Sequence, residues 1–291
     1  MPITRHGAAR PSAIMRIERK RSARLSAKVA IVVVGFGNMG QSLVRGWLAK
    51  GRAADSIRVV DPATTAHAVA RELGVAVEDE VAAAEVVLLA VKPNQLAEVL
   101  PRCGAAARAG AVFLSIAAGK TLPEIGKGLG GDAAIVRAMP NTPAAIGQGI
   151  TALVANAAVS RAQRALCGEL LAAVGSIAWL DEERHMDAVT AISGSGPAYV
   201  FLLIECFEQA AVELGLGAAL AKQLALATVA GAGAYAAKSG EAPAELRRRV
   251  TSPKGTTQAA LDVLMAEPGM RELLVRATRA AAERSRELAK V

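Results

Sequence analysis

The chain has 291 residues and a formal charge of +8, from 34 lysines and arginines against 26 acidic residues. Residues 1–28 hold eight of these bases and one acid, so this leader carries +7 and the rest of the chain is nearly neutral at +1. Only 3% of the residues are aromatic, whereas nucleic-acid binding relies on aromatic platforms or a basic folded face. These counts argue against nucleic acid as a partner.

The leader is rich in arginine and lacks the apolar segment of a secretory signal. We expect a disordered extension, with an organelle transit peptide as the alternative. The three cysteines, Cys103, Cys167 and Cys206, are widely separated, and their spacing indicates neither a disulfide framework nor a metal site. We therefore expect no metal and a reducing compartment, the cytoplasm.

Residues 29–34 form a continuous apolar run that ends at Gly35, as expected of a strand buried on both faces of a parallel sheet. The same interpretation predicts strands at 57–60, 86–91 and 112–116, and further strands are expected at 134–139, 150–154 and 176–179. Helical patterns alternate with them at 39–50, 64–73, near 94–101 and at 122–129. This alternation predicts an α/β fold with a doubly wound parallel sheet over residues 29–184.

After about Glu183 the strand-like runs stop, and Ala/Leu/Glu-rich stretches predict an all-helical region over residues 185–291. Its longest uncharged stretch, 188–204, is shorter than a membrane span and is interrupted by Ser193-Gly194-Ser195-Gly196-Pro197. Helices that are apolar all round are usually buried in a large core or between subunits. We therefore expect no membrane segment and a homo-oligomer.

The first strand leads into Gly35-Phe36-Gly37-Asn38-Met39-Gly40, a G-x-G-x-x-G motif that opens a helix. The first glycine permits a tight turn, the second admits a pyrophosphate, and the third allows close packing of helix and strand. Asp61 follows at the end of the second strand, as in dinucleotide-binding Rossmann domains.

An acid at the position of Asp61 usually binds a ribose 2′-hydroxyl and favours NADH over NADPH. The alternative is that Asp61 only caps the following helix. The hydroxyls of Thr64 and Thr65 could still hold a 2′-phosphate, so both NADH and NADPH remain open as cofactors.

Two further strand ends are expected at the same edge, where open α/β sheets bind ligands. Ala90-Val91-Lys92-Pro93 and Ala117-Ala118-Gly119 offer small residues against which a nicotinamide could lie. Lys92 would suit an anionic substrate, although a solvated lysine is an equal alternative. The proline-locked loop 139–143 would present polar groups, Asn141 among them, at this edge.

In the helical region, residues 251–258 have the pattern of a helix start, with Ser252 as N-cap and Pro253 at the first helical position. Backbone N–H groups and hydroxyls there would suit a carboxylate, although an ordinary capped helix is the alternative. No paired carboxylates, metal ligands or activated nucleophile are evident. Hydride transfer to an already protonated C=N bond needs little acid–base help and is favoured.

With these motifs, the sequence from about 29 to 288 resembles the pyrroline-5-carboxylate reductase family. The resemblance is carried by 35–40, 90–93, 115–119, 139–143, 191–199 and, above all, 250–257. It implies a Rossmann domain, a helical substrate and dimerisation domain, and reduction of L-1-pyrroline-5-carboxylate to L-proline by NADPH or NADH. The resemblance favours NADPH, whereas Asp61 favours NADH. It also implies an obligate homodimer, with a decamer as one possible higher oligomer.

The resemblance also implies roles for individual residues. The cofactor would be bound by Gly35, Phe36, Gly37, Asn38, Met39, Gly40, Asp61, Ala90, Val91, Lys92, Pro93, Ala117, Ala118 and Asn141. The substrate would be held by Ser252, Gly255, Thr256 and Thr257, with Thr257 as the catalytic hydrogen-bonding or proton-relay group.

One departure is Lys254, where the family usually has glycine. If that position needs a positive φ, lysine strains the loop; we favour a helical φ, with a positive charge added near the carboxylate. Val77, where many members have Asn, is a smaller departure.

Two other functions are considered. A β-hydroxyacid dehydrogenase of the same two-domain plan would need a lysine base shortly after a Gly-x-Gly, and none follows Gly194-Ser195-Gly196. A non-catalytic nucleotide sensor would depend on the leader for its function.

Overall fold

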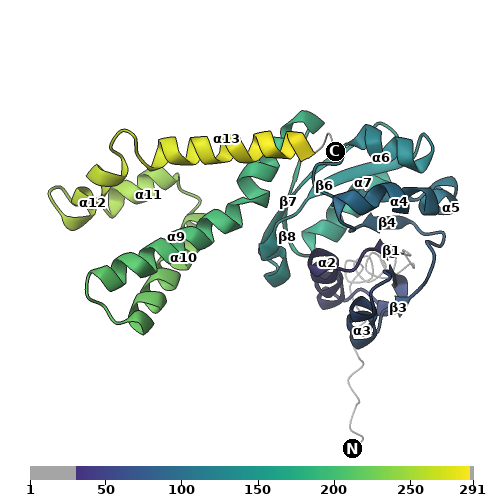
Figure 1. Ribbon diagram of the computed structural model, residues 1–291, viewed down its shortest axis with the longest axis horizontal. Coiled ribbons are helices and arrows are strands. Elements are labelled where there is room, and N and C mark those ends of the chain that lie inside the picture. The colour runs from purple at the N-terminus through teal and green to yellow at the C-terminus, as the bar shows by residue number, and fades with distance from the viewer. Residues whose placement is uncertain (1–30, 289–291) are drawn as a thin grey trace, which may run out of the picture.

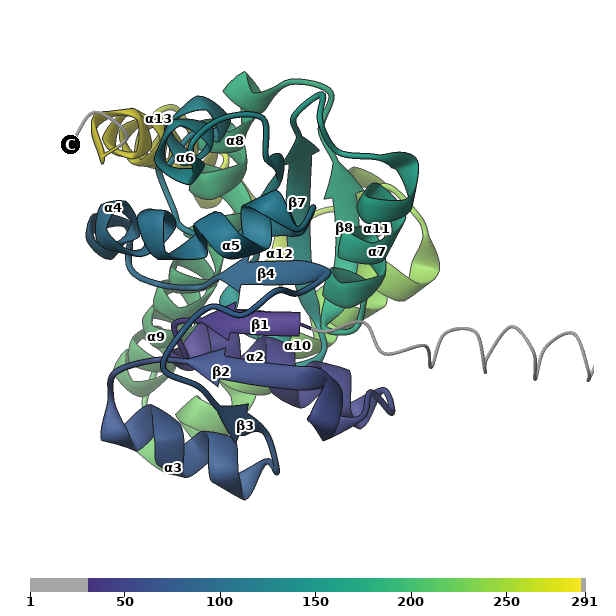
Figure 2. The ribbon, with the colours of Figure 1, turned by 90° about the vertical axis from the view of Figure 1, so that its right-hand side faces the viewer.

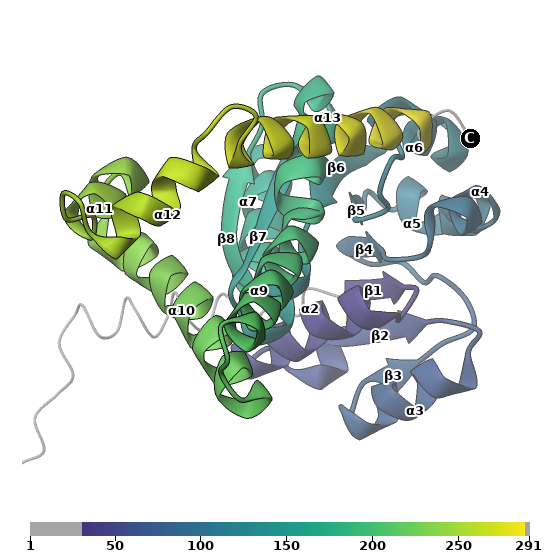
Figure 3. The ribbon, with the colours of Figure 1, turned by 60° about the vertical axis from the view of Figure 1, so that its left-hand side comes forward.

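A computed structural model describes residues 31–288, so the predicted leader lies outside the described part of the chain (Figure 1). The described chain has a sheet-containing half and a helical arm that extends from it (Figures 1 and 3). The strands are β1 (Ile31–Val34), β2 (Ile57–Val60), β3 (Ala76–Val77), β4 (Val86–Leu89), β5 (Val112–Ser115), β6 (Ala134–Met139), β7 (Gly149–Ala155) and β8 (Gly175–Trp179).

All eight strands form one sheet in the order β3-β2-β1-β4-β5-β6-β7-β8. Every neighbouring pair is parallel except β6 and β7, which are antiparallel. The predicted doubly wound sheet is confirmed in its first six strands, whose order is that of Rossmann domains. The one antiparallel pair was not predicted: the connection after β6 returns the chain as β7 alongside it.

Helices cover both faces of the sheet (Figure 2). Side chains alternate along each strand, so in β1 Ile31 and Val33 pack with α2 (Asn38–Ala49), α3 (Thr64–Glu72) and α7 (Arg161–Ala172). Val32 and Val34 face the opposite layer. That layer contains α4 (Leu96–Val99), α5 (Gly104–Arg108) and α6 (Leu122–Leu129).

The remaining short helices of this half are η1 (Ala54–Ser56), η2 (Pro93–Gln95), η3 (Leu100–Cys103) and η4 (Thr142–Ile146). In place of the single helix predicted near 94–101, the chain forms four consecutive short helices, η2, α4, η3 and α5. Pro93 and Pro101 lie in the first turns of η2 and η3. β4 ends at Leu89 and not at Val91, so the residues expected at its carboxyl end leave the sheet two positions earlier. The two-residue β3 was not predicted.

The helical arm contains η5 (Glu183–His185), α8 (Met186–Val189), η6 (Thr190–Gly194), α9 (Gly196–Glu213), α10 (Ala218–Ser239), α11 (Pro243–Arg249), α12 (Thr256–Leu264) and α13 (Met270–Leu288). Its first four elements, η5 to α9, form one continuous helix, Glu183–Glu213, in which η6 is a π-helical turn. α13 returns from the far end of the arm towards the sheet (Figure 3).

The arm leaves a large apolar surface uncovered. Phe201, Leu202 and Phe207 on α9, and Leu224 and Tyr235 on α10, are each about half exposed. Helix Glu183–Glu213 is long and apolar enough to cross a membrane by length and composition, and only 6% of its most apolar window is buried. A core within the single chain therefore does not cover these helices, which leaves burial between subunits as the predicted explanation.

Candidate active site

The motif Gly35–Gly40, here called the glycine loop, joins the end of β1 to α2. It lies beside the end of β4, the neighbour of β1 at which the strand order of the sheet reverses. Gly35 has φ +89°, and a Cβ atom there would lie 2.7 Å from the backbone of Ala90 and Val91. The loop that follows β1 is thus packed directly against the chain leaving β4. Open α/β sheets bind ligands at this switch point.

The second and third glycines have different surroundings. A Cβ atom on Gly40 would lie 2.9 Å from the carbonyl oxygen of Gly35, so this position keeps α2 close to the strand. A Cβ atom on Gly37 would meet nothing within 4 Å. Gly37 is also the N-cap of α2, where no side chain caps the helix and no acidic residue lies in the first turn. The first N–H groups of α2 therefore have no side-chain cap, and the space beside Gly37 is open, as a phosphate-binding helix start requires.

Both polar groups of the Phe36 backbone are hydrogen-bonded to side chains. Its N–H donates to Oδ2 of Asp61 at 2.6 Å, and its carbonyl oxygen accepts from Nε2 of Gln41 at 2.8 Å. The Phe36 ring is buried, so only its backbone could meet a cofactor. The role of Gln41 was not predicted, because nothing in the local sequence reveals this contact.

The Asp61 carboxylate accepts hydrogen bonds from two backbone N–H groups, one of them in the glycine loop. Besides the bond from Phe36, its Oδ1 accepts from the N–H of Ala63 at 2.8 Å. Ala63, not Asp61, is the N-cap of α3. The alternative in which Asp61 serves only as a helix cap is therefore wrong.

The ends of β4 and β5 present the expected small residues at this edge. The N–H of Ala90 donates to the carbonyl oxygen of Val34 at 2.7 Å, which ties it to the end of β1. Ala117 is buried, and its N–H donates to Oγ of Ser115 at 3.4 Å. Lys92 is exposed, and Pro93 begins η2.

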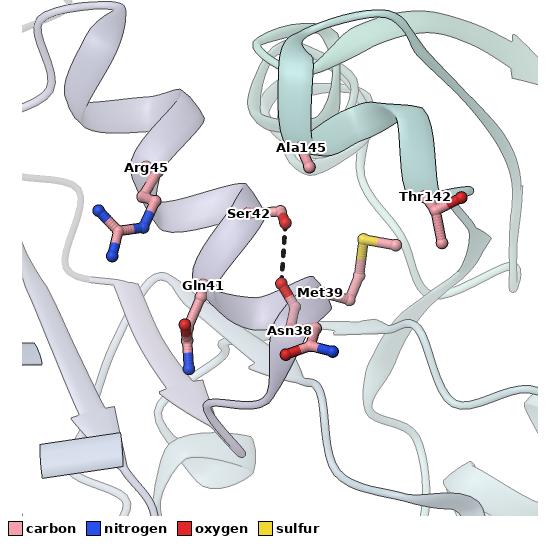
Figure 4. A pocket seen from close by; sticks show the side chains of 7 residues that line it. All are labelled: Asn38, Met39, Gln41, Ser42, Arg45, Thr142 and Ala145. Carbon is pink, nitrogen blue, oxygen red and sulfur yellow. Dashed lines mark hydrogen bonds between the residues drawn. The ribbon is translucent and has the colours of Figure 1, made fainter. Parts of the chain in front are cut away.

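A surface groove of about 440 Å³ adjoins the glycine loop (Figure 4). It lies between α2 and η4, so it connects the glycine loop with the loop that follows β6. In that second loop, Oδ1 of Asn141 accepts from the N–H of Ile150 at 2.9 Å, which holds the loop in place. The groove is lined by Asn38, Met39, Gln41, Ser42, Arg45, Thr142 and Ala145.

The predicted carboxylate loop joins α11 to α12. The helix begins at Thr256 with Gly255 as N-cap, so the prediction that Ser252 is the N-cap and Pro253 the first helical residue is wrong. Residues 252–255 instead form a turn in which the N–H of Gly255 donates to the carbonyl oxygen of Ser252 at 3.0 Å. α12 has neither a side-chain cap nor an acidic residue in its first turn, so its N-terminal N–H groups can attract an anion.

Lys254 has φ 59° and is the only non-glycine residue with positive φ among residues 31–288. Our preference for a helical φ at this position is therefore wrong. The left-handed conformation brings Cβ close to the following carbonyl oxygen, which explains why glycine suits this position.

The two predicted halves of the site are far apart in the single chain. The glycine loop and the ends of β1 and β4 belong to the sheet-containing half, whereas the loop between α11 and α12 lies at the opposite end of the arm (Figures 1 and 3). One chain therefore brings the cofactor residues together but does not bring the substrate residues to them.

The sequence matches two family models. Residues 28–119 match NADP oxidoreductase coenzyme F420-dependent, and residues 183–288 match pyrroline-5-carboxylate reductase dimerisation. A pyrroline-5-carboxylate reductase of Pseudomonas aeruginosa is 45% identical over 264 residues, which covers 89% of this chain and 96% of that protein. The chain belongs to the pyrroline-5-carboxylate reductase family.

Solved structures agree with this assignment. A pyrroline-5-carboxylate reductase from Coxiella burnetii superposes with a TM-score of 0.86 at 37% identity, covering 91% of this chain and all of that one. The Plasmodium falciparum reductase, solved with NADP bound, has a TM-score of 0.77 at 26% identity, covering 90% of this chain and 98% of that one. The predicted family, the fold class and an NAD(P)-dependent oxidoreductase are confirmed, and the family supersedes the β-hydroxyacid dehydrogenase alternative.

Proposed function

We propose that this pyrroline-5-carboxylate reductase family member reduces L-1-pyrroline-5-carboxylate to L-proline, with NADH as the preferred donor. The observation that carries the proposal is the open cradle at Gly37, in front of the uncapped start of α2. A Cβ atom would enter this space without touching the protein, which fits a pyrophosphate. When bound, the reduced nicotinamide supplies the hydride for the C=N carbon.

The preference for NADH rests on charge at the end of β2. The Asp61 carboxylate lies beside the glycine loop, and residues 61–66 contain no lysine or arginine. A 2′-phosphate would meet this carboxylate without a neighbouring cation in that segment, whereas a ribose hydroxyl could donate to it. The test is Asp61→Ser, which should shift the NADH:NADPH ratio of kcat/KM towards NADPH. An unchanged ratio would remove Asp61 from cofactor selection.

The chain's own residues bind and orient the substrate in this proposal. The N-terminus of α12, with the hydroxyls of Ser252 and Thr256, receives the carboxylate. The Thr257 hydroxyl holds the ring nitrogen. Because a protonated C=N bond is electrophilic without further activation, no strong acid or base is needed beside the reacting carbon.

We propose that the complete site forms between two copies of the chain. The loop between α11 and α12 is distant from its own glycine loop (Figures 1 and 3), and α9 and α10 expose apolar side chains suited to a second arm. In such a homodimer, the substrate loop of one protomer works with the cofactor cradle of its partner.

Three further expectations remain proposals: a division between the two domains at 184/185, a cytoplasmic location, and a possible assembly of dimers up to a decamer. The domain division is supported by the sheet ending at Trp179 and the arm beginning at Glu183. The oligomer count can be measured by sedimentation.

The test of the activity is oxidation of NADH and of NADPH in the presence of pyrroline-5-carboxylate. The proposal predicts turnover with both donors and a higher kcat/KM with NADH. If neither donor is oxidised, the proposed reaction is wrong.

A mixed-dimer assay tests the shared site. Gly37→Asp places a charge in the cofactor cradle, and Thr257→Ala removes the substrate hydroxyl. A purified heterodimer of these two impaired chains should recover about half of the wild-type activity, well above either variant homodimer, because one of its two sites is intact. No recovery would mean that each site uses residues of a single chain.

A further inference from the structure

A partly buried ion pair joins the sheet to the first turn of the arm. Arg137 lies on β6, and its side chain is only 6% exposed. Its Nη1 donates to Oε1 of Glu183 at 2.8 Å. The same oxygen accepts from the N–H of Leu122, the first residue of α6, also at 2.8 Å. Glu183 thus binds two elements of the sheet-containing half at the residue where the arm begins.

A second contact lies on the same side of β6. Met139 is two residues beyond Arg137, so both side chains point to one face of the strand. A Cβ atom on Gly194 would lie 2.4 Å from Cε of Met139, so the helix passes close to the flexible end of this side chain. The arm therefore meets side chains of β6 at Glu183 and again at Gly194, eleven residues further along.

The arm also returns to this joint. Ser285, near the end of α13, is buried, and its Oγ donates to Oδ1 of Asp187 at 2.7 Å. Arg286 lies 3.9 Å from the other oxygen of the same carboxylate. The first and last helices of the arm thus meet within a few residues of the Arg137–Glu183 pair.

The length of α13 separates this joint from the loop between α11 and α12. α13 has 19 residues and is therefore about 28 Å long, and it separates the joint from α12. A tilt of about 4° at the joint would move the far end by roughly 2 Å. Misplacement of a reacting group by about 1 Å can cost a hundredfold in rate, so small errors in this angle matter for the site.

We propose that Arg137 and Glu183 are a positioning pair that sets the angle of the arm, and that they thereby place the substrate loop in the partner protomer's site. The inference rests on the intersubunit site proposed above. Buried ion pairs are poor devices for stability, because well-packed apolar residues often serve as well. Their directional bonds instead fix one geometry.

The first test compares Arg137→Met and Glu183→Gln with a matched control, Arg52→Met. Arg52 pairs with Glu169 on α7 at 3.8 Å and is 16% exposed, so its ion pair joins two segments of the sheet-containing half. We expect kcat/KM for pyrroline-5-carboxylate to fall at least tenfold in Arg137→Met and severalfold in Glu183→Gln. NADH affinity, measured by fluorescence, should change less than twofold. If Arg52→Met lowers kcat/KM as much as Arg137→Met does, the Arg137–Glu183 pair has only a general structural role and the proposal is wrong.

Mixed dimers decide on which site the pair acts, using Arg137→Met and Thr257→Ala in two arrangements. If the pair places its own chain's loop in the partner's site, a heterodimer with both changes on one chain keeps one intact site and about half the activity. With the changes on different chains, neither site is intact. The reverse pattern would overturn the proposal and assign Arg137 to its own chain's cofactor site.

The two arrangements contain the same substitutions, so a general loss of folding affects both equally and cannot produce the predicted difference. Equal activities in the two arrangements would also overturn the proposal. The Gly37→Asp and Thr257→Ala heterodimer reports separately on the shared site. If that heterodimer recovers activity but the two Arg137→Met arrangements do not show the predicted difference, the shared site stands and only the positioning pair is rejected.

Discussion

Lys254→Gly should stabilise the protein. Lys254 has φ 59°, and the left-handed conformation costs a non-glycine residue about 1–2 kcal/mol. Glycine removes this cost but gains about 0.4–1 kcal/mol of conformational freedom in the unfolded chain. Lys254 is exposed and has no ion pair with another residue of 31–288, so removal of its side chain loses little. The net gain is about 0.5–1 kcal/mol per chain.

For a domain of roughly 150–250 residues, 1 kcal/mol corresponds to about 2–4 °C in Tm, so we expect a rise of about 1–3 °C. The assay is thermal unfolding, supported by denaturant titration at fixed protein concentration. Lys254→Ala is the matched control, because it removes the same side chain but keeps the left-handed strain. Lys254→Asn should fall between, since asparagine tolerates this conformation. Equal Tm values for the Gly and Ala variants would refute the reasoning.

Three other predictions follow from the site and the core. Gly37→Ala should leave Tm within about 1 °C but weaken NADH binding at least tenfold. Gly35→Ala should lower Tm strongly, because its Cβ would meet the backbone of Ala90 at 2.7 Å. A larger loss of Tm in Gly37→Ala than in Gly35→Ala, measured by calorimetry, would contradict the open space at Gly37. Thr257→Ala should lower kcat/KM about 10- to 100-fold with unchanged NADH affinity, and wild-type kinetics would remove it from the site. Burial raises the pKa of Cys103 to about 11, against a smaller opposing effect of Arg102, and burial raises that of Cys167 to about 12. Because the folded state holds these protons more tightly than the unfolded one, stability should fall as pH rises above about 9, and denaturant midpoints independent of pH between 8 and 10.5 would contradict this.

The sequence was sufficient to predict the glycine loop because each step depends on local pattern. An apolar run, three glycines and a following helix occupy neighbouring positions, and the structure gives each glycine distinct surroundings. α6 and β6 were also predicted with their observed bounds, since Thr121 and Gly130 cap the one and five of the six residues of the other are apolar, Arg137 being the exception.

The start of α12 was misplaced because Ser252-Pro253 is equally compatible with a turn. The turn is closed by the N–H of Gly255, and this delays the helix until Thr256. The φ of Lys254 could not be predicted from its residue type, because lysine normally avoids the conformation that the turn imposes.

Contacts between distant residues carried no local signal. Arg137 and Glu183 are 46 positions apart, and each could equally have been a solvated surface charge. The separation between the glycine loop and the loop after α11 likewise depends on how the arm leaves the sheet. Helical pattern predicts that such helices exist but not their direction.

The central claim is that a hydride from the nicotinamide reduces the C=N carbon of pyrroline-5-carboxylate in this enzyme. The most direct measurement is mass spectrometry and NMR of proline formed with NADH deuterated at C4 of the nicotinamide. The account predicts one deuterium in L-proline, at C5, the former C=N carbon, when the transferred face is labelled. Proline without deuterium from either labelled face, or with deuterium at the carbon bearing the carboxylate, would contradict it.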